Sequence, residues 1–112
     1  MLPKSKRLNL KKDFKWVASG KKIESKYAKL FIKIGDNTNP RVSIAVSSSL
    51  FKKATERNRA RRLVAEAFHN TYYLLPNTIN IVALPKHKVL EVKSSDVFLD
   101  LQKLLKDEKI IG

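Results

Sequence analysis

Apolar residues recur along the chain with two different periods, and each period predicts a different kind of element. Residues 26–34 and 41–47 alternate apolar and polar residues, which is typical of strands with one buried face. The turn-forming segment GDNTNP (35–40) separates them, so we expect an antiparallel hairpin. The residues expected on the buried face are Ala28, Leu30, Ile32 and Ile34 of the first strand and Val42, Ile44 and Val46 of the second.

Three other segments repeat their apolar residues every three to four positions, which is typical of amphipathic helices. Between the second and third of these, TINIVAL (78–84) predicts one more strand, limited by Pro85. The expected helices are 11–19, capped by Asn9 and ended by Gly20, a long helix over 52–73, and a C-terminal helix from Ser94 or Ser95 to about Lys109.

This order of elements predicts an α+β fold, in which helices pack on a single sheet. The sequence of elements is helix, strand pair, helix, strand and helix, with room for one additional strand before the long helix. A chain of 112 residues suits one domain, residues 1–112. Residues 1–8 are basic, and we expect them to form a mobile arm.

Charge points to a polyanionic partner for this small domain. The chain carries 24 Lys and Arg against 10 Asp and Glu, which gives a net charge of +14. Residues 1–75 contribute +13 of this charge, so the basic surface belongs to the first two thirds of the chain. Nucleic acid and anionic membrane are the partners that such a surface favours.

Composition excludes several other classes of function. The chain has no cysteine, which removes disulfides, thiol nucleophiles and zinc knuckles. It shows neither a secretory signal nor a run of about 20 apolar residues, so we expect a cytoplasmic protein. Its three glycines form no phosphate-binding loop, and we expect no small-molecule substrate. His69 and His87 lack neighbouring ligand or base residues, so we expect no catalytic residue and no metal site in the chain itself.

The most basic segment is ERNRARR (56–62), on the expected long helix. At 100° per residue, Arg57 and Arg61 flank the apolar stripe on one side and Arg59 flanks it on the other. Arg62 and Ala65 fall on the outer face. Arginine offers planar, bidentate donors that match phosphate, so we expect this helix to bind nucleic acid. The residues expected to do so are Lys52, Lys53, Arg57, Asn58, Arg59, Arg61 and Arg62.

A second candidate surface is the polar face of the expected hairpin. Lys29, Phe31 and Lys33 of one strand share this face with Arg41 of the other. Aromatic rings stack on bases while cations follow phosphates, a combination that suits single-stranded RNA. Core packing is the alternative role of Phe31. Trp16 lies off the apolar stripe of its helix, where it would either stack on a ligand or cover the N-terminal arm.

The segment KKATERNRARRLVAEAF (52–68) resembles the signature of the bacterial ribonuclease P protein component. The shared pattern is an Arg-Asn-Arg core, a basic pair two residues later, and then Glu and Phe. The dipeptide DF (13–14), Gly20 and PRVSIAVS (40–47) also agree, and the order of elements matches over nearly the whole chain. The matching residues of the motif are Ala54, Arg57, Asn58, Arg59, Arg61, Arg62, Glu66 and Phe68.

The resemblance implies a protein cofactor within an endoribonuclease holoenzyme, where a catalytic RNA with bound Mg²⁺ removes the 5′ leader from precursor tRNA. The arginine motif would meet the catalytic RNA, and a cleft between the first helix and the sheet would hold the single-stranded leader. It also implies a left-handed strand–helix–strand crossover, an exception to the usual right-handed rule. The residues implied for the leader are Phe14, Lys29, Phe31, Lys33 and Arg41, with core packing as the other role of Phe14.

The sequence departs from the family pattern next to these surfaces. Two lysines are usual where Ser48 and Ser49 stand, and an arginine is usual where a strand ends at Leu84–Pro85. The other departures are Ala18 for an aromatic residue, Ala65 for an arginine and His69 for a basic residue. All of them concern contacts with RNA and leave the core motif intact.

Three alternatives fit the charge without the resemblance. A general RNA-binding or ribosome-binding protein would share the charge and the fold but need no catalytic RNA. A membrane-binding helix would carry bulky apolar residues beside its charges, which this one lacks, so we expect no membrane partner. A solvated helix face with an Arg62–Glu66 ion pair is the structural alternative, although surface pairs contribute little.

Overall fold

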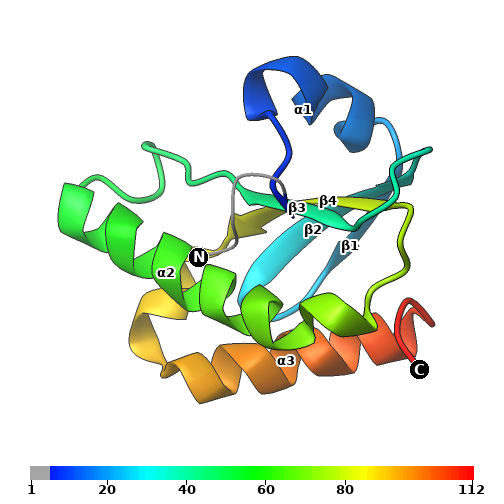
Figure 1. Ribbon diagram of the computed structural model, residues 1–112. Helices are drawn as coiled ribbons and strands as arrows, with labels where there is room; N and C mark the ends of the chain where they lie inside the picture. Colours follow the sequence, from blue (N-terminus) through cyan, green and yellow to red (C-terminus); the bar gives the residue numbers. More distant parts are fainter. Residues whose placement is uncertain (1–5) are drawn as a thin grey trace.

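A single four-stranded sheet lies between one helix and a pair of helices (Figure 1). The computed structural model describes residues 6–112, so residues 1–5 of the expected basic arm lie outside the described residues. The α+β class is confirmed, and the additional strand before the long helix is present. The elements are α1 (Leu10–Ala18), β1 (Lys21–Glu24), β2 (Ala28–Ile34), β3 (Arg41–Ile44), α2 (Ala54–Thr71), the short 3₁₀ helix η2 (Tyr72–Leu74), β4 (Ile79–Pro85), the 3₁₀ helix η3 (His87–Glu91) and α3 (Ser94–Asp107).

The expected hairpin between β2 and β3 is wrong. The strand order is β1-β2-β4-β3, so β4 lies between them. It pairs antiparallel with β2 and parallel with β3, while β1 forms the antiparallel partner of β2. β4 is buried at six of its seven positions and therefore needs a neighbour on each edge and cover on each face. The parallel β3–α2–β4 unit is the strand–helix–strand crossover.

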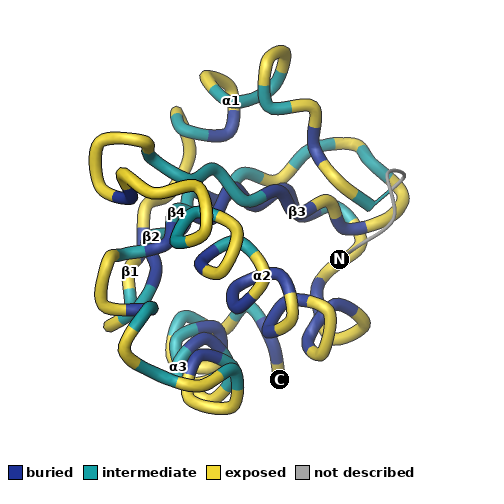
Figure 2. Tube along the Cα trace, turned by 90° about the vertical axis from the view of Figure 1, so that its left-hand side faces the viewer, coloured by how far each residue is buried: buried dark blue, intermediate teal, exposed yellow. Residues whose placement is uncertain are grey.

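The two faces of the sheet carry separate apolar clusters. α2 and α3 cover one face, where Leu30, Ile81, Phe68 and Leu101 are fully buried in the main core. α1 covers the other face with a smaller cluster centred on Val17. Figure 2 shows the buried segments of α2, α3 and the sheet turned toward one another, with the exposed segments outside. The expected buried face of β2 is confirmed for Ala28, Leu30 and Ile32, which enter the main core, but it is wrong for Ile34, which is 59% exposed at the end of the strand.

Local signals at the helix ends are only partly as expected. Asn9 caps α1, since its side chain accepts a hydrogen bond from the Lys11 amide at 3.1 Å. Gly20 follows α1 without a positive φ, so it is no left-handed cap. The absence of a side chain at Gly20 instead allows the backbone of β2 to approach it closely, because a Cβ there would collide with the Ile32 carbonyl oxygen. The caps expected at Ser94 or Ser95 are wrong: Lys93 is the N-cap, and its amide donates to the Asp96 carboxylate at 3.1 Å.

Candidate nucleic-acid interface

The basic residues of ERNRARR lie on α2, and the structure leaves them without acidic partners. Among residues 6–112 the ion pairs are Lys21 with Glu108, Lys86 with Glu24 and Lys103 with Asp107. The alternative Arg62–Glu66 pair is therefore not formed. Guanidinium groups gathered without carboxylates repel one another, and a polyanion would relieve that repulsion. We call the following set the arginine surface: Lys52, Lys53, Arg57, Asn58, Arg59, Arg61 and Arg62.

Three arginines of this surface are held by the protein's own polar groups. Arg57 Nη1 donates to the carbonyl oxygens of Phe51 at 2.9 Å and Lys52 at 3.1 Å, which fixes the segment that leads into α2. Arg59 Nη2 donates to the Val92 carbonyl at 3.4 Å. Arg61 Nη1 donates to the Asn58 side chain at 3.2 Å. These contacts reduce the conformational freedom that the side chains would lose on binding a ligand.

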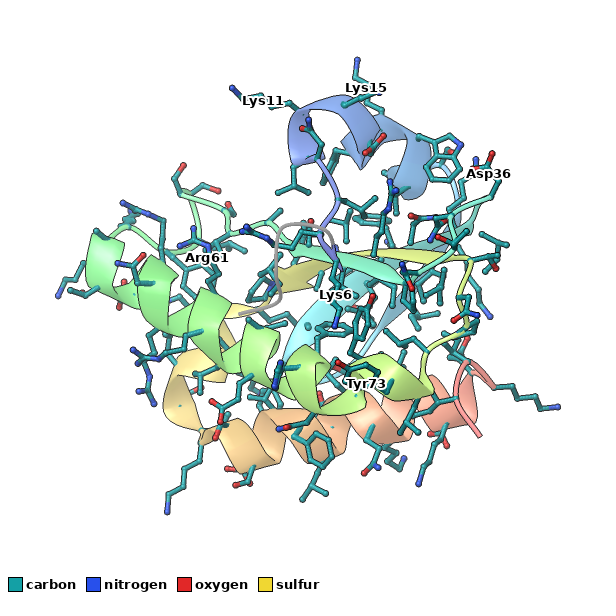
Figure 3. All side chains as sticks on the ribbon, in the orientation of Figure 1. Lys6, Lys11, Lys15, Asp36, Arg61 and Tyr73 are labelled. Carbon is teal, nitrogen blue, oxygen red and sulfur yellow. The ribbon has the colours of Figure 1, made fainter. Side chains whose placement is uncertain are left out.

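A groove of about 770 Å³ runs beside this surface, between the start of α1, β3 and α2. We call it the basic groove, because it is lined by five cationic side chains and only one acidic one, Asp13. Arg61 belongs both to the groove and to the arginine surface; Figure 3 shows it on α2, with Lys11 on α1 across from it. The cationic side chains of the groove are Arg7, Lys11, Lys12, Arg41 and Arg61.

The groove includes residues that the helical pattern did not predict. Ala65 was expected on the outer face of α2, but it is 3% exposed and lines the groove with Arg61. This side of α2 faces β3 and the chain segment that precedes α1. Arg7 was expected in a mobile arm, yet it also lines the groove. The signal available in the sequence was Leu8, an apolar residue within a basic segment, which is buried.

The sheet face under α1 holds the residues implied for the leader, and it brings the aromatic pair together. The rings of Phe14 and Phe31 meet edge to face, with centroids 6.3 Å apart. Both are half-buried and pack against the cluster of Val17 and Val82. Core packing, the alternative role, is therefore part of what these two rings do. Arg41 is exposed at the edge strand β3 and is the one residue of the implied leader set that lines the basic groove.

The two lysines of β2 differ in their surroundings. Lys33 Nζ donates to the Ser19 hydroxyl at 2.7 Å and lies 5.4 Å from the centre of the Trp16 ring, so it is tied to the end of α1. Lys29 makes no such contact among residues 6–112, and its cross-strand partner on β1 is Glu24. Trp16 is 42% exposed and lies beside Lys33, which explains its position off the apolar stripe of α1.

Two ionisable groups have altered affinities for protons. The hydrogen bond and the charge of Lys86 lower the pKa of Glu24, with smaller contributions from Lys29 and Lys22. Burial raises the pKa of Tyr72, against a smaller opposing effect of the Lys6 charge. Neither group lies at the arginine surface, so neither shift indicates a catalytic acid or base there.

Neither a cluster of metal ligands nor a helix able to cross a membrane occurs in the described part of the chain. No group of three or more His, Asp or Glu side chains that would hold a metal ion occurs within residues 6–112. Over the same residues, none of the helices combines the length and the apolar character that a membrane crossing requires. His69 and His87 are both exposed, and the His87 ring stacks on the buried Phe51 ring with centroids 5.3 Å apart.

Comparison with known proteins gives one consistent family. A family model described as Ribonuclease P matches residues 2–109. The ribonuclease P protein component of Pseudoalteromonas atlantica is 40% identical over 77 residues, which cover 69% of this chain and 63% of that relative. The chain thus spans less than two thirds of that relative's length. The component of Thermotoga maritima is 31% identical over 86 residues, which are 76% of this chain and 73% of the relative.

Solved structures share the architecture. The RNase P protein from Thermotoga maritima superposes with a TM-score of 0.79 at 29% identity, covering 90% of this chain and 96% of that one. The RNase P protein from Staphylococcus aureus gives a TM-score of 0.81, with 97% of this chain and 100% of that one covered. Its identity is 19%, so this second likeness concerns the fold alone.

Proposed function

This chain belongs to the ribonuclease P protein family, and on that premise we propose that it is the protein cofactor of a ribonuclease P holoenzyme. The arginine surface docks the protein on the catalytic RNA. The observation that carries this proposal is the set of guanidinium groups on α2, which have no carboxylate partner among residues 6–112 and sit in the family's arginine motif. Guanidinium forks bind phosphate in a bidentate manner, so this surface suits an RNA backbone.

The sheet face under α1 is proposed to hold the single-stranded 5′ leader of precursor tRNA. Lys29 and Arg41 supply cations to its phosphates, and the half-buried rings of Phe14 and Phe31 present their remaining faces and edges to its bases. The basic groove adjoins both surfaces through Arg61 and Arg41. A leader on the sheet face would therefore lie close to the catalytic RNA docked on α2.

Cleavage of the leader is assigned to the RNA. The protein's side chains then act by neutralising phosphates, because each Lys or Arg contact releases condensed counterions when two RNA segments approach. Mg²⁺ would be bound mainly by the catalytic RNA, where it supplies charge for the displacement at phosphorus. Residues 6–112 include no group of three or more His, Asp or Glu side chains that would hold a metal ion.

Reconstitution tests this function. The protein is combined with a bacterial ribonuclease P RNA and a precursor tRNA at low Mg²⁺ concentration, and release of the 5′ leader is followed. We expect faster release with the protein than without it, and no cleavage by the protein alone. Stimulation no greater than that of an unrelated basic protein of equal charge would refute the proposal and favour a general RNA-binding function.

A matched pair of variants separates the arginine surface from general charge. Arg59→Ala removes one cation from α2, and Lys106→Ala removes one exposed cation from α3. We expect the first to weaken binding to the catalytic RNA and the second to leave it nearly unchanged. Equal losses would mean that net charge alone, and not the arginine surface, determines affinity.

A further inference from the structure

Residues 6–9 connect the end of α2 with β3 and the start of α1. Lys6 lies beside Tyr72 and Tyr73, the residues that directly follow α2. Leu8 is buried at β3, and its carbonyl oxygen accepts a hydrogen bond of 2.8 Å from the Ser43 hydroxyl. Residues 6–9 therefore bridge three elements that are distant in the sequence.

The anchor at the beginning of this connection is a cluster of one cation and two aromatic rings. Lys6 Nζ lies 4.7 Å from the centre of the Tyr72 ring and 4.9 Å from that of Tyr73, within the range of cation–π attraction. It also donates a hydrogen bond of 3.1 Å to the Tyr73 hydroxyl. The two rings meet edge to face at 5.4 Å. Figure 3 shows Lys6 and Tyr73 close together at the C-terminal half of α2.

Tyr72 makes this anchor rigid. It is 3% exposed, and its hydroxyl donates to the Pro40 carbonyl oxygen at 2.6 Å. Tyr73, in contrast, is 82% exposed, although it is a large aromatic residue with no place in the core. Its contacts with Lys6 and with the Tyr72 ring give this exposed side chain a structural role, because Tyr73 is the more exposed of the two rings that hold Lys6.

Arg7 lies between the two fixed residues, Lys6 and Leu8, and lines the basic groove. We propose that Lys6, Tyr72 and Tyr73 form a clasp that positions Arg7 in the basic groove to bind an RNA phosphate. The identification of this ligand as an RNA phosphate rests on the proposed function. With its neighbours held on both sides, Arg7 loses less conformational freedom on binding than an arginine in a free arm would.

Two other interpretations use the same residues. Lys6 itself could contact phosphate, in which case Tyr73 would matter little for RNA binding. Tyr73 could instead stack directly on a base, because it is exposed and aromatic. Tyr73→Ala distinguishes all three, since it changes no charge: any change in the salt dependence of RNA binding must then come from a displaced cation. Tyr73→Phe keeps the ring, and Leu74→Ala alters an exposed neighbour without touching the clasp.

The first measurement needs no RNA. Trypsin cleavage after Arg7 is followed by mass spectrometry in the full chain and its variants. We expect Tyr73→Ala to speed this cleavage about fivefold by releasing the segment, while Tyr73→Phe and Leu74→Ala remain near the original rate. An unchanged rate in Tyr73→Ala would overturn the clasp, whatever the RNA measurements give.

The second measurement is the affinity for ribonuclease P RNA over a series of KCl concentrations. The slope of log K against log salt is negative, and we expect Arg7→Gln to reduce its magnitude by about 0.7 to 0.9, the contribution of one phosphate contact. Tyr73→Ala should reduce this magnitude by a similar amount, and the double variant should reduce it no more than Arg7→Gln alone. Additive losses, or a weaker affinity with an unchanged slope, would overturn the positioning role in favour of a direct contact.

If the unaltered protein binds this RNA no better than an unrelated basic protein, the proposed function and the phosphate role fail together, while the protease result still decides the clasp.

Discussion

Replacing Arg57 should lower both stability and RNA affinity, whereas replacing Arg62 should lower affinity alone. Arg57 Nη1 donates to two backbone carbonyl oxygens of the segment before α2, at 2.9 and 3.1 Å. Arg62 is exposed on the same helix, and the hydrogen bonds within residues 6–112 include none from its guanidinium. The two arginines thus share a charge and an expected partner but differ in their structural contacts.

The difference in stability can be estimated from these contacts. A hydrogen bond from a charged donor contributes about 1.5 to 3 kcal/mol in favourable sites. Arg57 is half-exposed, so we expect about 1 to 2 kcal/mol for its two bonds together. At roughly 4 °C per kcal/mol for a domain near this size, Arg57→Ala should lower the melting temperature by about 4 to 8 °C. Arg62→Ala should change it by less than about 2 °C.

Thermal unfolding followed by circular dichroism measures the first effect, and affinity for the catalytic RNA over a salt series measures the second. Both alanine variants should reduce the magnitude of the salt slope by about 0.7 to 0.9. Arg57→Lys serves as a control, because it keeps the charge but lacks the forked donors: it should retain the slope and lose part of the stability. Equal melting temperatures for the two alanine variants would refute the structural role of Arg57, and unchanged slopes in both would place the RNA contact elsewhere.

Three further outcomes follow from the same structure. Gly20→Ala should destabilise the fold by more than about 2 kcal/mol in urea unfolding, because its Cβ would meet a carbonyl oxygen of β2; a smaller loss would mean that the backbone shifts easily. Burial raises the pKa of Tyr72, so the protonated hydroxyl of this residue stabilises the folded state. This stabilisation is present below the pKa of an unfolded tyrosine and is lost as pH rises through the folded pKa. Tyr72→Phe should remove that alkaline loss, at the expense of about 1 kcal/mol for the bond to Pro40; an equal alkaline loss in both proteins would contradict the shift. Lys29→Ala should weaken binding of a leader-bearing precursor relative to mature tRNA more than Lys33→Ala does, because Lys33 is already engaged by Ser19 and Trp16, and the reverse order would refute this ranking.

The elements themselves follow from local patterns, and most of them could be predicted. The cap at Asn9, the alternation of β2 and the apolar stripe of α2 depend on residues within a few positions of one another. The pairing of the strands does not. A two-residue period shows which face of β3 is buried, but it carries no information about which strand lies beside it. The insertion of β4 between β2 and β3 is decided by the burial of β4 on both faces.

The candidate site was predictable to a similar extent. The arginine surface follows from one helix and one motif, so its residues could be named from the sequence. The basic groove could not, because it needs α1, β3 and α2 together with Arg7 and Ala65, whose positions depend on how residues 6–9 connect these elements. The contact of Lys33 with Ser19 and Trp16 likewise depends on how α1 lies on the sheet.

The central position of β4 also determines when during synthesis the domain can form. Ala28 pairs with Pro85 and Ile34 with Ile79, so β2 and β4 close a loop that contains β3 and all of α2. Until β4 leaves the ribosome, β2 and β3 have no common neighbour, and only the local β1–β2 hairpin and isolated helices can form. Pairing over such separations is slow to nucleate, because the entropy of loop closure is lost before any contact compensates for it. The sheet face and the basic groove are thus late products of folding, although nearly all of their charges are synthesised first.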